Sequence, residues 1–404
     1  MQKAIAIIAT LDTKGHEVAY LKKEIERRGF RTIIIDSGMR GKPVGVKPDI
    51  SREEVAKASG KSYDDIEKLG RGDAEDLMMK GLKKVIMDLY LSGKINGILS
   101  IGGSDGTALA SAAMRALPLG IPKLAVTPYM KYCETFAGTK DITFIHSVAD
   151  ISGVNVITKK IFDNAIAAIT GMVEAGVPVG PSGEKAIAAS MYGNTTPCVI
   201  KAKEILEENG YEVVIFCPNI GTRAMEELIQ QRYFRGLLDV TTQDVVDAVM
   251  GGDYPALPNR LEVAGEVGIP QVIVPGCVDF TIRGSEDSLP PEYKNRRRYH
   301  FNPVVTLVRL NEREMEEMGR IFAKKLNKAK GPTRVLFPLR GLSMYDKMGE
   351  PLYDPKGDYA FLEALKANLK PSIELIEVDA HINDPEFAEK CARSLLELLR
   401  DSQK

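Results

Sequence analysis

The sequence predicts an α/β protein with two doubly wound, mostly parallel-sheet (Rossmann-like) domains. Short runs rich in Val, Ile and Ala alternate with longer segments of helical periodicity along almost the whole chain, which is typical of βαβ units. At 404 residues the chain is too long for one ordinary core. A Gly- and Pro-rich stretch without periodicity, 176–183, interrupts the alternation. We therefore expect two domains, 1–180 and 184–404, joined by a linker.

The first domain opens with the strand 3–9, which leads through the polar loop 10–15 into a helix with Val18, Leu21 and Ile25 on its apolar face. Segment 37–72 is rich in Gly, Pro and charge, and we expect one short helix in it and a role as a mobile flap. The other predicted elements follow in βαβ order: strand 32–35, helix 73–92, strand 97–101, helix 107–116, strand 123–126, a strand within 141–150 and helix 159–175.

The second domain repeats the alternation after the linker. Its predicted strands are 185–190, 212–216, 236–240, 271–274, 333–337 and 373–378. Its predicted helices are 197–209, one that begins at 223, one that ends at 250, and then 311–327, 357–369 and 384–401. Segment 275–302 shows no clear periodicity, and we expect it to be irregular.

Composition excludes several classes of protein. A formal charge of −1 argues against nucleic acid or an anionic membrane as the main partner. No apolar run approaches the roughly 20 residues that a membrane helix needs, and the first residues do not resemble a secretory signal. The five cysteines form no C-x-x-C pair, which disfavours a disulfide framework or a zinc site. We expect a cytoplasmic protein.

The most informative loop follows strand 97–101 and reads Gly-Gly-Ser-Asp-Gly-Thr. Glycines let backbone N–H groups approach a phosphate closely, and the amino end of the next helix adds a favourable dipole. A tight turn without a ligand is the alternative, but three glycines within five residues exceed what a turn requires. The loop therefore predicts phosphate contacts from Gly102, Gly103, Ser104, Gly106 and Thr107.

The loop after the first strand lies where nucleotide folds meet their ligand, at the carboxyl end of a strand. Thr10 and Thr13 can bond a phosphate and Lys14 can offset its charge, while Asp12, like Asp105 of the glycine loop, can hold Mg²⁺. A solvated loop whose Asp or Thr caps the helix is an equal alternative. Asp36 ends the second strand about twenty residues after this loop and is placed to bond ribose hydroxyls.

Loops after the strands of the second domain also carry polar residues. Loops that converge at one sheet edge usually form a ligand cleft, although each of these residues can equally cap a helix. The candidates for a second ligand, an unknown anionic small molecule, are Asn194, Thr195, Thr196, Gly221, Thr222, Thr242 and Arg340. The basic run 294–298 can also grip an anion, and a solvated charged turn is as good an interpretation.

Several motifs in a fixed order resemble the two-domain family of the tomato mosaic virus resistance protein, from one end of the chain to the other. The matching stretches are 9–15, 101–107, 141–155, 192–197, 223–226, 238–242 and 302–307. The resemblance implies an N-terminal domain that binds ATP and Mg²⁺, a C-terminal Rossmann-like domain and a homodimer.

These observations favour an ATP-dependent enzyme that acts on the unknown anion in the cleft between its two domains. A non-catalytic ATP-binding module, in which the nucleotide stabilises a dimer or a partner-binding surface, is the alternative. A dinucleotide-binding protein is a third interpretation, and the missing G-x-G-x-x-G counts against it. The sequence does not identify catalytic residues.

Overall fold

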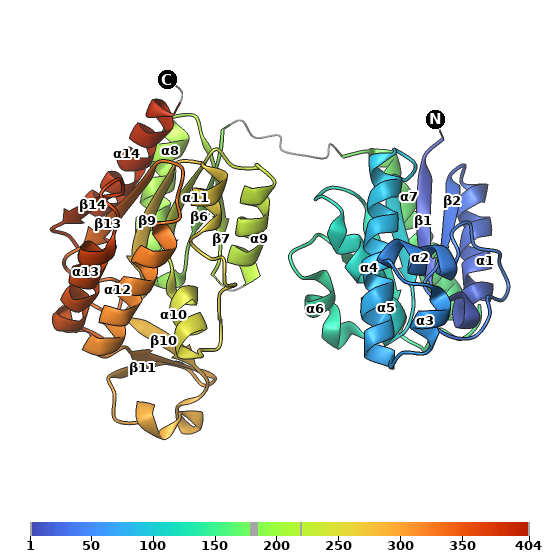
Figure 1. The fold of residues 1–404 in the computed structure, drawn as a ribbon, viewed down its shortest axis with the longest axis horizontal. Coiled ribbons are helices and arrows are strands. Elements are labelled where there is room, and N and C mark those ends of the chain that lie inside the picture. The colour runs from blue at the N-terminus through green and yellow to red at the C-terminus, as the bar shows by residue number, and fades with distance from the viewer. Residues whose placement is uncertain (1, 178–184, 219, 403–404) are drawn as a thin grey trace. The chain divides into compact units, whose positions relative to one another are not determined.

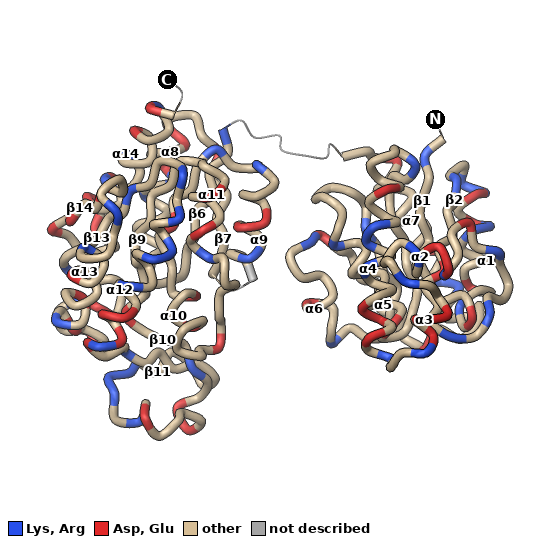
Figure 2. Tube along the Cα trace, in the orientation of Figure 1, with Lys and Arg blue, Asp and Glu red and all other residues tan. Residues whose placement is uncertain are grey.

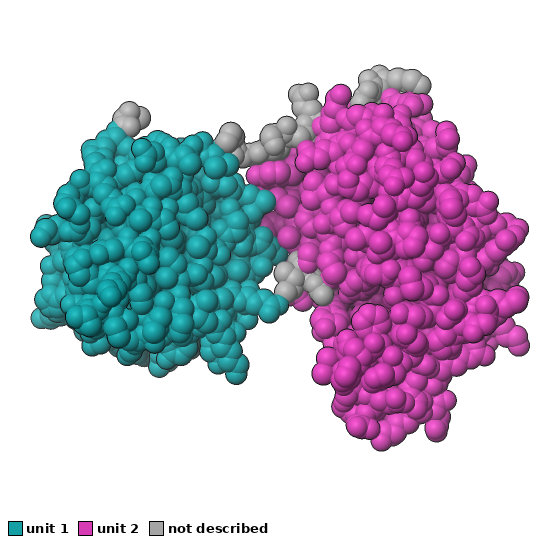
Figure 3. Space-filling view, turned by 180° about the vertical axis from the view of Figure 1, so that it is seen from behind, with its two compact units in different colours: residues 1–180 teal, residues 181–404 magenta. Residues whose placement is uncertain are grey.

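The computed structural model describes residues 2–177, 185–218 and 220–402. The chain divides into two compact units, residues 1–180 and 181–404, which Figure 3 colours separately. Each unit has its own central sheet and its own hydrophobic core. Most of the predicted linker, residues 178–183, lies outside the described residues.

A five-stranded parallel sheet forms the centre of the first unit, in the order β2-β1-β3-β4-β5 (Figure 1). Its central strands are fully buried, as expected where helices cover both faces of a sheet. The order reverses at β1, because β2 pairs on one side of it and β3 on the other. The strands are β1 (Ala4–Ala9), β2 (Arg31–Asp36), β3 (Gly97–Ile101), β4 (Lys123–Thr127) and β5 (Thr143–His146).

Helices cover both faces of this sheet. One face packs against α1 (Leu11–Arg27) and α7 (Thr158–Ala175). The other packs against α2 (Arg52–Ser59), α4 (Arg71–Leu91) and α5 (Ser104–Ala116). The short helices α3 (Tyr63–Glu67) and α6 (Cys133–Ala137) complete the unit.

Segment 37–72 differs from the prediction. It holds α2 and α3 rather than one helix, and it also contains the start of α4. Val55, Ala56 and Ile66 are completely buried in the core that these helices form with the sheet. The flap interpretation is therefore wrong, because this apolar side of the segment is part of the domain core.

A six-stranded parallel sheet forms the centre of the second unit, in the order β14-β13-β9-β8-β6-β7. The order reverses at β6, which pairs with β7 on one side and β8 on the other. The strands are β6 (Ala186–Ser190), β7 (Glu212–Phe216), β8 (Gly236–Thr241), β9 (Gln271–Gly276), β13 (Thr333–Pro338) and β14 (Glu374–Val378).

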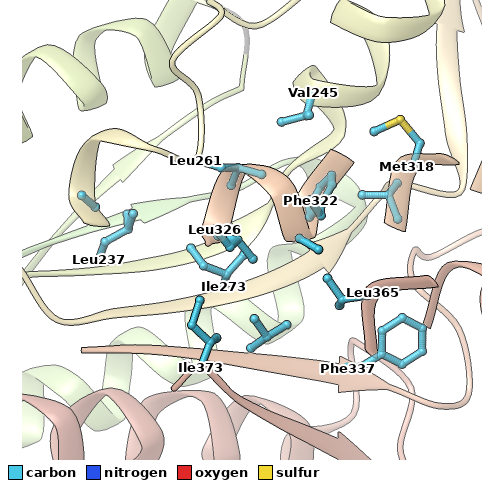
Figure 4. Close-up of a cluster of buried hydrophobic side chains, with 14 of the residues drawn as sticks. Leu237, Val245, Leu261, Ile273, Met318, Phe322, Leu326, Phe337, Leu365 and Ile373 are labelled. Atoms are coloured by element: carbon cyan, nitrogen blue, oxygen red, sulfur yellow. The ribbon is translucent and has the colours of Figure 1, made fainter. Parts of the chain in front are cut away.

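Two cores lie on the two faces of this sheet. The larger one, part of which is drawn in Figure 4, includes Ile273, Phe322, Phe337 and Leu365. It joins the sheet to α9 (Ile220–Gln230), α10 (Gln243–Met250), α11 (Val263–Val267), α12 (Glu312–Leu326) and α13 (Pro355–Asn368). On the other face the sheet packs against α8 (Thr196–Glu208) and α14 (Pro385–Asp401).

Segment 275–302 is more ordered than predicted. Strands β10 (Phe280–Arg283) and β11 (Arg298–Asn302) both pair antiparallel with β12 (Val305–Arg309) and form a small three-stranded sheet. This sheet lies at one end of the second unit, near α10 (Figure 1). The expectation of irregular structure is therefore wrong for much of this segment.

Charged residues of both signs are interspersed along both units (Figure 2). This distribution agrees with the formal charge of −1. Within the described residues, no helix combines the length and the apolar character that crossing a membrane requires.

Candidate functional site

The carboxyl ends of β1 and β3 are neighbours in the first unit. The two strands pair directly, with Ile8 opposite Ser100. Open parallel sheets bind their ligands at such a point, where the strand order reverses. The two loops that the sequence singles out, at residues 10–15 and 102–107, are therefore brought to the same edge of the sheet.

The predicted loop 10–15 is largely the first turn of α1, which begins at Leu11. Thr10 is the N-cap residue, and its side chain makes no capping hydrogen bond. Its carbonyl oxygen accepts from the N–H of Lys14 at 2.9 Å, and its hydroxyl lies 3.1 Å from the hydroxyl of Thr13. The two threonines thus face the edge as a pair of hydroxyl groups.

Asp36 is a structural residue rather than a ribose ligand. Its carboxylate is completely buried and accepts from Arg52 Nε at 2.7 Å, and from the backbone N–H groups of Leu11 and Gly38 at 3.1 and 2.9 Å. No accessible oxygen remains for a sugar. The predicted ribose contact is corrected for this reason.

Asp12 and Lys14 lie at the beginning of α1. Burial raises the pKa of Asp12, nearby Arg52 lowers it and Asp36 raises it, and the Oδ1 atom of Asp12 is buried without a hydrogen-bond partner among the described residues. The Lys14 ammonium donates to the carbonyl oxygen of Ile151 at 2.6 Å. Lys14 therefore ties the segment before α7 to α1 in this structure.

The predicted glycine loop is shorter than expected, because α5 begins at Ser104. The two glycines before it have different roles. A Cβ atom on Gly102 would lie 2.9 Å from the Cα of Gly106, so Gly102 is required by the close approach of α5 to the strand end. A Cβ atom on Gly103 would meet only the ring of Tyr129, at 3.8 Å, and Gly103 has an ordinary φ of −72°. The fold alone does not require a glycine at 103.

The amino end of α5 is open. No side chain caps it, and among the described residues no acceptor meets the backbone N–H groups of Gly103, Ser104, Asp105 and Gly106. Four free donors and the helix dipole make such an end an anion-binding feature. The predicted phosphate contacts of Gly103, Ser104 and Gly106 are therefore compatible with this geometry.

Thr107 is placed differently from the prediction. Its side chain is buried, and its hydroxyl lies 2.7 Å from the Gly103 carbonyl oxygen and 2.9 Å from the hydroxyl oxygen of Thr127 at the end of β4. These contacts hold the glycine turn against the neighbouring strand. Thr107 thus stabilises the glycine turn through these two hydrogen bonds rather than contacting a phosphate.

Asp105 forms an ion pair with Arg71, whose Nε lies 3.0 Å from the carboxylate. The predicted metal ligands are therefore one paired carboxylate, Asp105, and one partly buried one, Asp12. The described part of the chain contains no group of three or more His, Cys, Asp and Glu side chains that could hold a metal ion. A magnesium site built by the protein alone is not supported.

In the second unit, three of the predicted second-ligand residues have buried hydroxyls with internal partners. Thr195 lies 2.7 Å from the Thr241 hydroxyl, Thr222 donates to Asp244 at 2.6 Å, and Thr242 donates to the carbonyl oxygen of Val274 at 3.2 Å. Thr222 also belongs to the first turn of α9 together with Gly221, rather than to a loop. These threonines stabilise the edge of the sheet.

Of the remaining candidates, Thr196 and Arg340 have partners within the protein, and Asn194 lines a pocket. Thr196 donates to the Tyr192 carbonyl oxygen at 3.0 Å, and Arg340 forms a two-bond ion pair with Asp379 at 2.8 Å. Asn194 lines a pocket of about 280 Å³. In the basic run, Arg296 and Arg298 pair with Glu314 and Glu286, which favours the interpretation as a charged turn.

Sequence reasoning missed the aromatic residues of this pocket, among them Tyr254, Phe280 and Phe301. Two of them lie in the small antiparallel sheet that was expected to be irregular. It also missed Arg52, whose guanidinium pairs with the Asp36 carboxylate that was expected to bind a ribose.

Comparison with known proteins places the whole chain in one family. A model described as the N-terminal domain of the uncharacterised protein family UPF0261 matches residues 3–178, and the model of its C-terminal domain matches residues 184–399. A UPF0261 protein of Clostridium tetani is 43% identical over 403 residues, which cover 99% of this chain and 100% of that protein. The ToMV resistance protein Tm-1(GCR237) of Solanum lycopersicum is 34% identical over 337 residues, which cover 81% of this chain but 45% of the tomato protein.

Solved structures resemble the chain only weakly. The UDP-N-acetylglucosamine 2-epimerase of Rickettsia bellii aligns over 99% of this chain and 96% of its own, with 11% identity and a TM-score of 0.24. So low a score supports no inference about function. The two family models and the sequence relatives confirm the resemblance that the motifs predicted. The chain belongs to the uncharacterised protein family UPF0261 and contains both domains of that family.

Proposed function

We propose that the first unit binds the phosphates of a nucleotide, ATP, at the carboxyl edge of its sheet between β1 and β3. The observation that carries the proposal is the open amino end of α5. Its free N–H groups follow a glycine, Gly103, that the fold does not require. A residue without a side chain at this position leaves room for a phosphate to approach the backbone.

The two helix ends at this edge differ in a way that supports α5 as the phosphate contact. The amino end of α1 already receives negative charge from Asp36, through the bond to the Leu11 N–H. A phosphate there would face a buried carboxylate, whereas the free N–H groups of α5 meet no acceptor among the described residues. The hydroxyls of Thr10 and Thr13 complete the proposed contacts from the side of β1.

In this proposal Mg²⁺ enters with the nucleotide, since the phosphates supply most ligands of the ion in such sites. Asp12 carries an oxygen without a hydrogen-bond partner among the described residues. It is the protein group that would hold the ion. Asp105 remains paired with Arg71 and takes no part.

We further propose that the protein is an ATP-dependent enzyme of the cytoplasm that acts as a homodimer. All five cysteines lie in the described residues and none is in a disulfide, which supports a reducing compartment. A non-catalytic ATP-binding module is the alternative. Release of inorganic phosphate from ATP on a time scale of minutes favours the enzyme, whereas tight binding without turnover favours the module.

The experiment is a calorimetric titration of the full chain with ATP, with inorganic triphosphate and with adenosine, each with and without Mg²⁺. If phosphate recognition at α5 dominates, ATP and triphosphate both bind and adenosine does not. Sedimentation of the same samples gives the oligomeric state. Binding of adenosine alone, or of none of the three at millimolar concentration, would overturn the proposal.

A further inference from the structure

The pocket of the second unit lies at the carboxyl end of β6, where the order of the second sheet reverses. One wall is the turn that follows β6, with Gly193 and Asn194, and the opposite wall is the small antiparallel sheet of β10, β11 and β12. Its volume is about 280 Å³. Since a cavity of about 150 Å³ accommodates benzene, this volume fits one or two rings.

The lining of this pocket is aromatic and uncharged. Phe280 and Leu307 form a buried floor, while Tyr254 and Phe301 are partly exposed at its rim. The lining also contains the amides of Asn194 and Asn302 and the phenol ring of Tyr192. None of the lining residues is a Lys, Arg, Asp, Glu or His. Such a lining disfavours an anion, because a carboxylate or phosphate would lose its hydration without gaining a cation.

One lining residue has a polar atom without a partner. The hydroxyl oxygen of Tyr192 is buried and makes no hydrogen bond to the described residues. Burial, followed by the nearby Cys217 and Asp244, raises the pKa of Tyr192, so this hydroxyl stays protonated and is a donor. A buried hydroxyl without a partner is costly, and an acceptor on a ligand would remove that cost.

We propose that this pocket binds an uncharged, planar ring that carries a hydrogen-bond acceptor for the Tyr192 hydroxyl. The ring lies between the aromatic rim of Tyr254 and Phe301 and the apolar floor. The ligand is therefore an aromatic or heteroaromatic molecule, or the ring portion of a larger one, rather than the small anion that the sequence suggested. The proposal is independent of nucleotide binding in the first unit.

The test uses benzamide as a probe, with benzoate as its anionic counterpart and cyclohexanecarboxamide as its saturated counterpart. Affinities for the full chain come from titrations followed by saturation-transfer NMR, because a fragment of this size binds in the millimolar range. We expect benzamide to bind at least ten-fold more tightly than benzoate. We also expect the saturated amide to bind more weakly than benzamide, because it cannot stack on the aromatic rim.

Two neighbouring valines give a matched pair of variants. Val305 lines the pocket, so Val305→Phe fills it and weakens benzamide at least ten-fold. Val304 is 69% exposed and is not a lining residue, so Val304→Phe leaves the affinity unchanged. Equal affinity of the two variants for benzamide, or benzoate bound as tightly as benzamide, would overturn the proposal. So would the absence of benzamide binding at tens of millimolar.

Tyr192→Phe is the second variant. It tests the proposed pocket even if Val305→Phe lowers the melting temperature and its weaker binding could reflect partial unfolding. The lost hydroxyl has no partner among the described residues, so the variant should fold as the parent does. Benzamide should bind about three- to ten-fold more weakly, the equivalent of one neutral hydrogen bond. Unchanged affinity would show that the hydroxyl does not face the ligand and would overturn the proposed orientation.

Discussion

The Asp36 carboxylate accepts a hydrogen bond from the backbone N–H of Leu11 at 3.1 Å. A negatively charged side chain of the protein itself therefore lies at the amino end of α1. At the amino end of α5, beside the neighbouring strand, no carboxylate among the described residues accepts from the free backbone N–H groups, and the one acidic residue of its first turn, Asp105, is paired with Arg71. The two loops that look alike in the sequence therefore differ electrostatically. This difference is the reason why we assign phosphate binding to α5, next to Gly103, and a structural role to Asp36.

Asp36→Asn should destabilise the first unit strongly. Asp36 and Arg52 are both buried, with 0% and 2% of their side chains exposed, and the variant leaves the Arg52 charge without its partner. Removing one member of a buried ion pair costs about 3–5 kcal/mol. Asp379→Asn breaks the exposed pair with Arg340 and should leave the melting temperature almost unchanged. An Asp36→Asn protein of normal stability that no longer binds ATP would restore the ribose interpretation.

Gly103→Val should weaken ATP binding without unfolding the protein. The residue has an ordinary φ, and its nearest neighbour, the Tyr129 ring, lies at 3.8 Å from a Cβ atom built there, so the backbone and its surroundings accept a Cβ atom. That side chain would stand where the phosphate approaches α5. Losing one or two contacts of roughly 1.5–3 kcal/mol each weakens binding about ten-fold to several hundred-fold or more. Calorimetric titration with ATP measures the change.

Gly102→Ala is the matched comparison for Gly103→Val, and it should act on stability. Its Cβ atom would lie 2.9 Å from the Cα of Gly106, so α5 must shift away from β3. We expect a lower melting temperature of the ligand-free protein. Gly171→Ala, at an exposed position inside α7 where a Cβ atom meets nothing within 4 Å, is the control and should not lower the melting temperature. If Gly103→Val lowers the melting temperature and keeps its ATP affinity, the glycine turn serves only the fold.

Asp105→Asn should leave the Mg²⁺ dependence of ATP binding unchanged. The carboxylate is held by Arg71 at the protein surface, and the proposed ion ligand is Asp12. Asp12→Asn should instead reduce the gain in affinity that Mg²⁺ provides. Titrations of both variants with ATP, in the presence and absence of Mg²⁺, make the comparison. A loss of Mg²⁺ dependence in Asp105→Asn alone would mean that the ion pair opens when the nucleotide binds.

The alternation of strands and helices could be predicted because each βαβ unit carries its own local signal. Strand β3 at 97–101 and β7 at 212–216 coincide with the predicted ranges. Strand β10 was missed because it has only four residues and its partner, β12, comes much later in the chain. The turns at 10–15 and 104–107 contain Thr, Asp, Ser and Gly, which favour loops and helix starts alike, so their helical state depended on tertiary contacts.

Site residues were harder to predict than the fold. The sequence correctly indicates that Asp36 stands at the end of a strand, but nothing local shows that Arg52, sixteen residues later, pairs with its carboxylate. Thr107 and Thr195 likewise stand at the right edge, yet their hydroxyls point to other strands. Position at a strand end follows from periodicity, whereas the direction of a side chain depends on partners that are distant in the sequence.

A buried cluster in the second unit predicts how stability depends on pH. Arg260 contacts three carboxylates: it makes two bonds to Asp239 and one to Asp244, and its contact with Glu226 is longer, at 3.3 Å. The same Glu226 oxygen also accepts from the backbone N–H of Leu261 at 3.2 Å. Burial raises the pKa of Glu226 to about 7; Arg260 opposes this shift, while Asp239 and Asp244 add to it. One arginine cannot compensate three charges, so we expect Glu226 to be the carboxylate of this cluster that holds a proton in the native state below about pH 7.

Stability should therefore fall as the pH rises from about 5 to 8. The native protein retains a proton on Glu226 that the unfolded chain releases near its ordinary pKa of 4.5, so the stabilisation present below that pH is lost as the pH rises through about 7. At about 1.4 kcal/mol for each unit, the loss is on the order of 3 kcal/mol. Asp247 and Asp279, with pKa values raised by burial to about 6 and about 7, act in the same direction.

Glu226→Gln mimics the protonated side chain and should flatten the dependence of the melting temperature on pH, while the exposed Glu212→Gln should preserve it. A parental slope in Glu226→Gln would show that Glu226 is ionised in the native protein and that Arg260 compensates its charge.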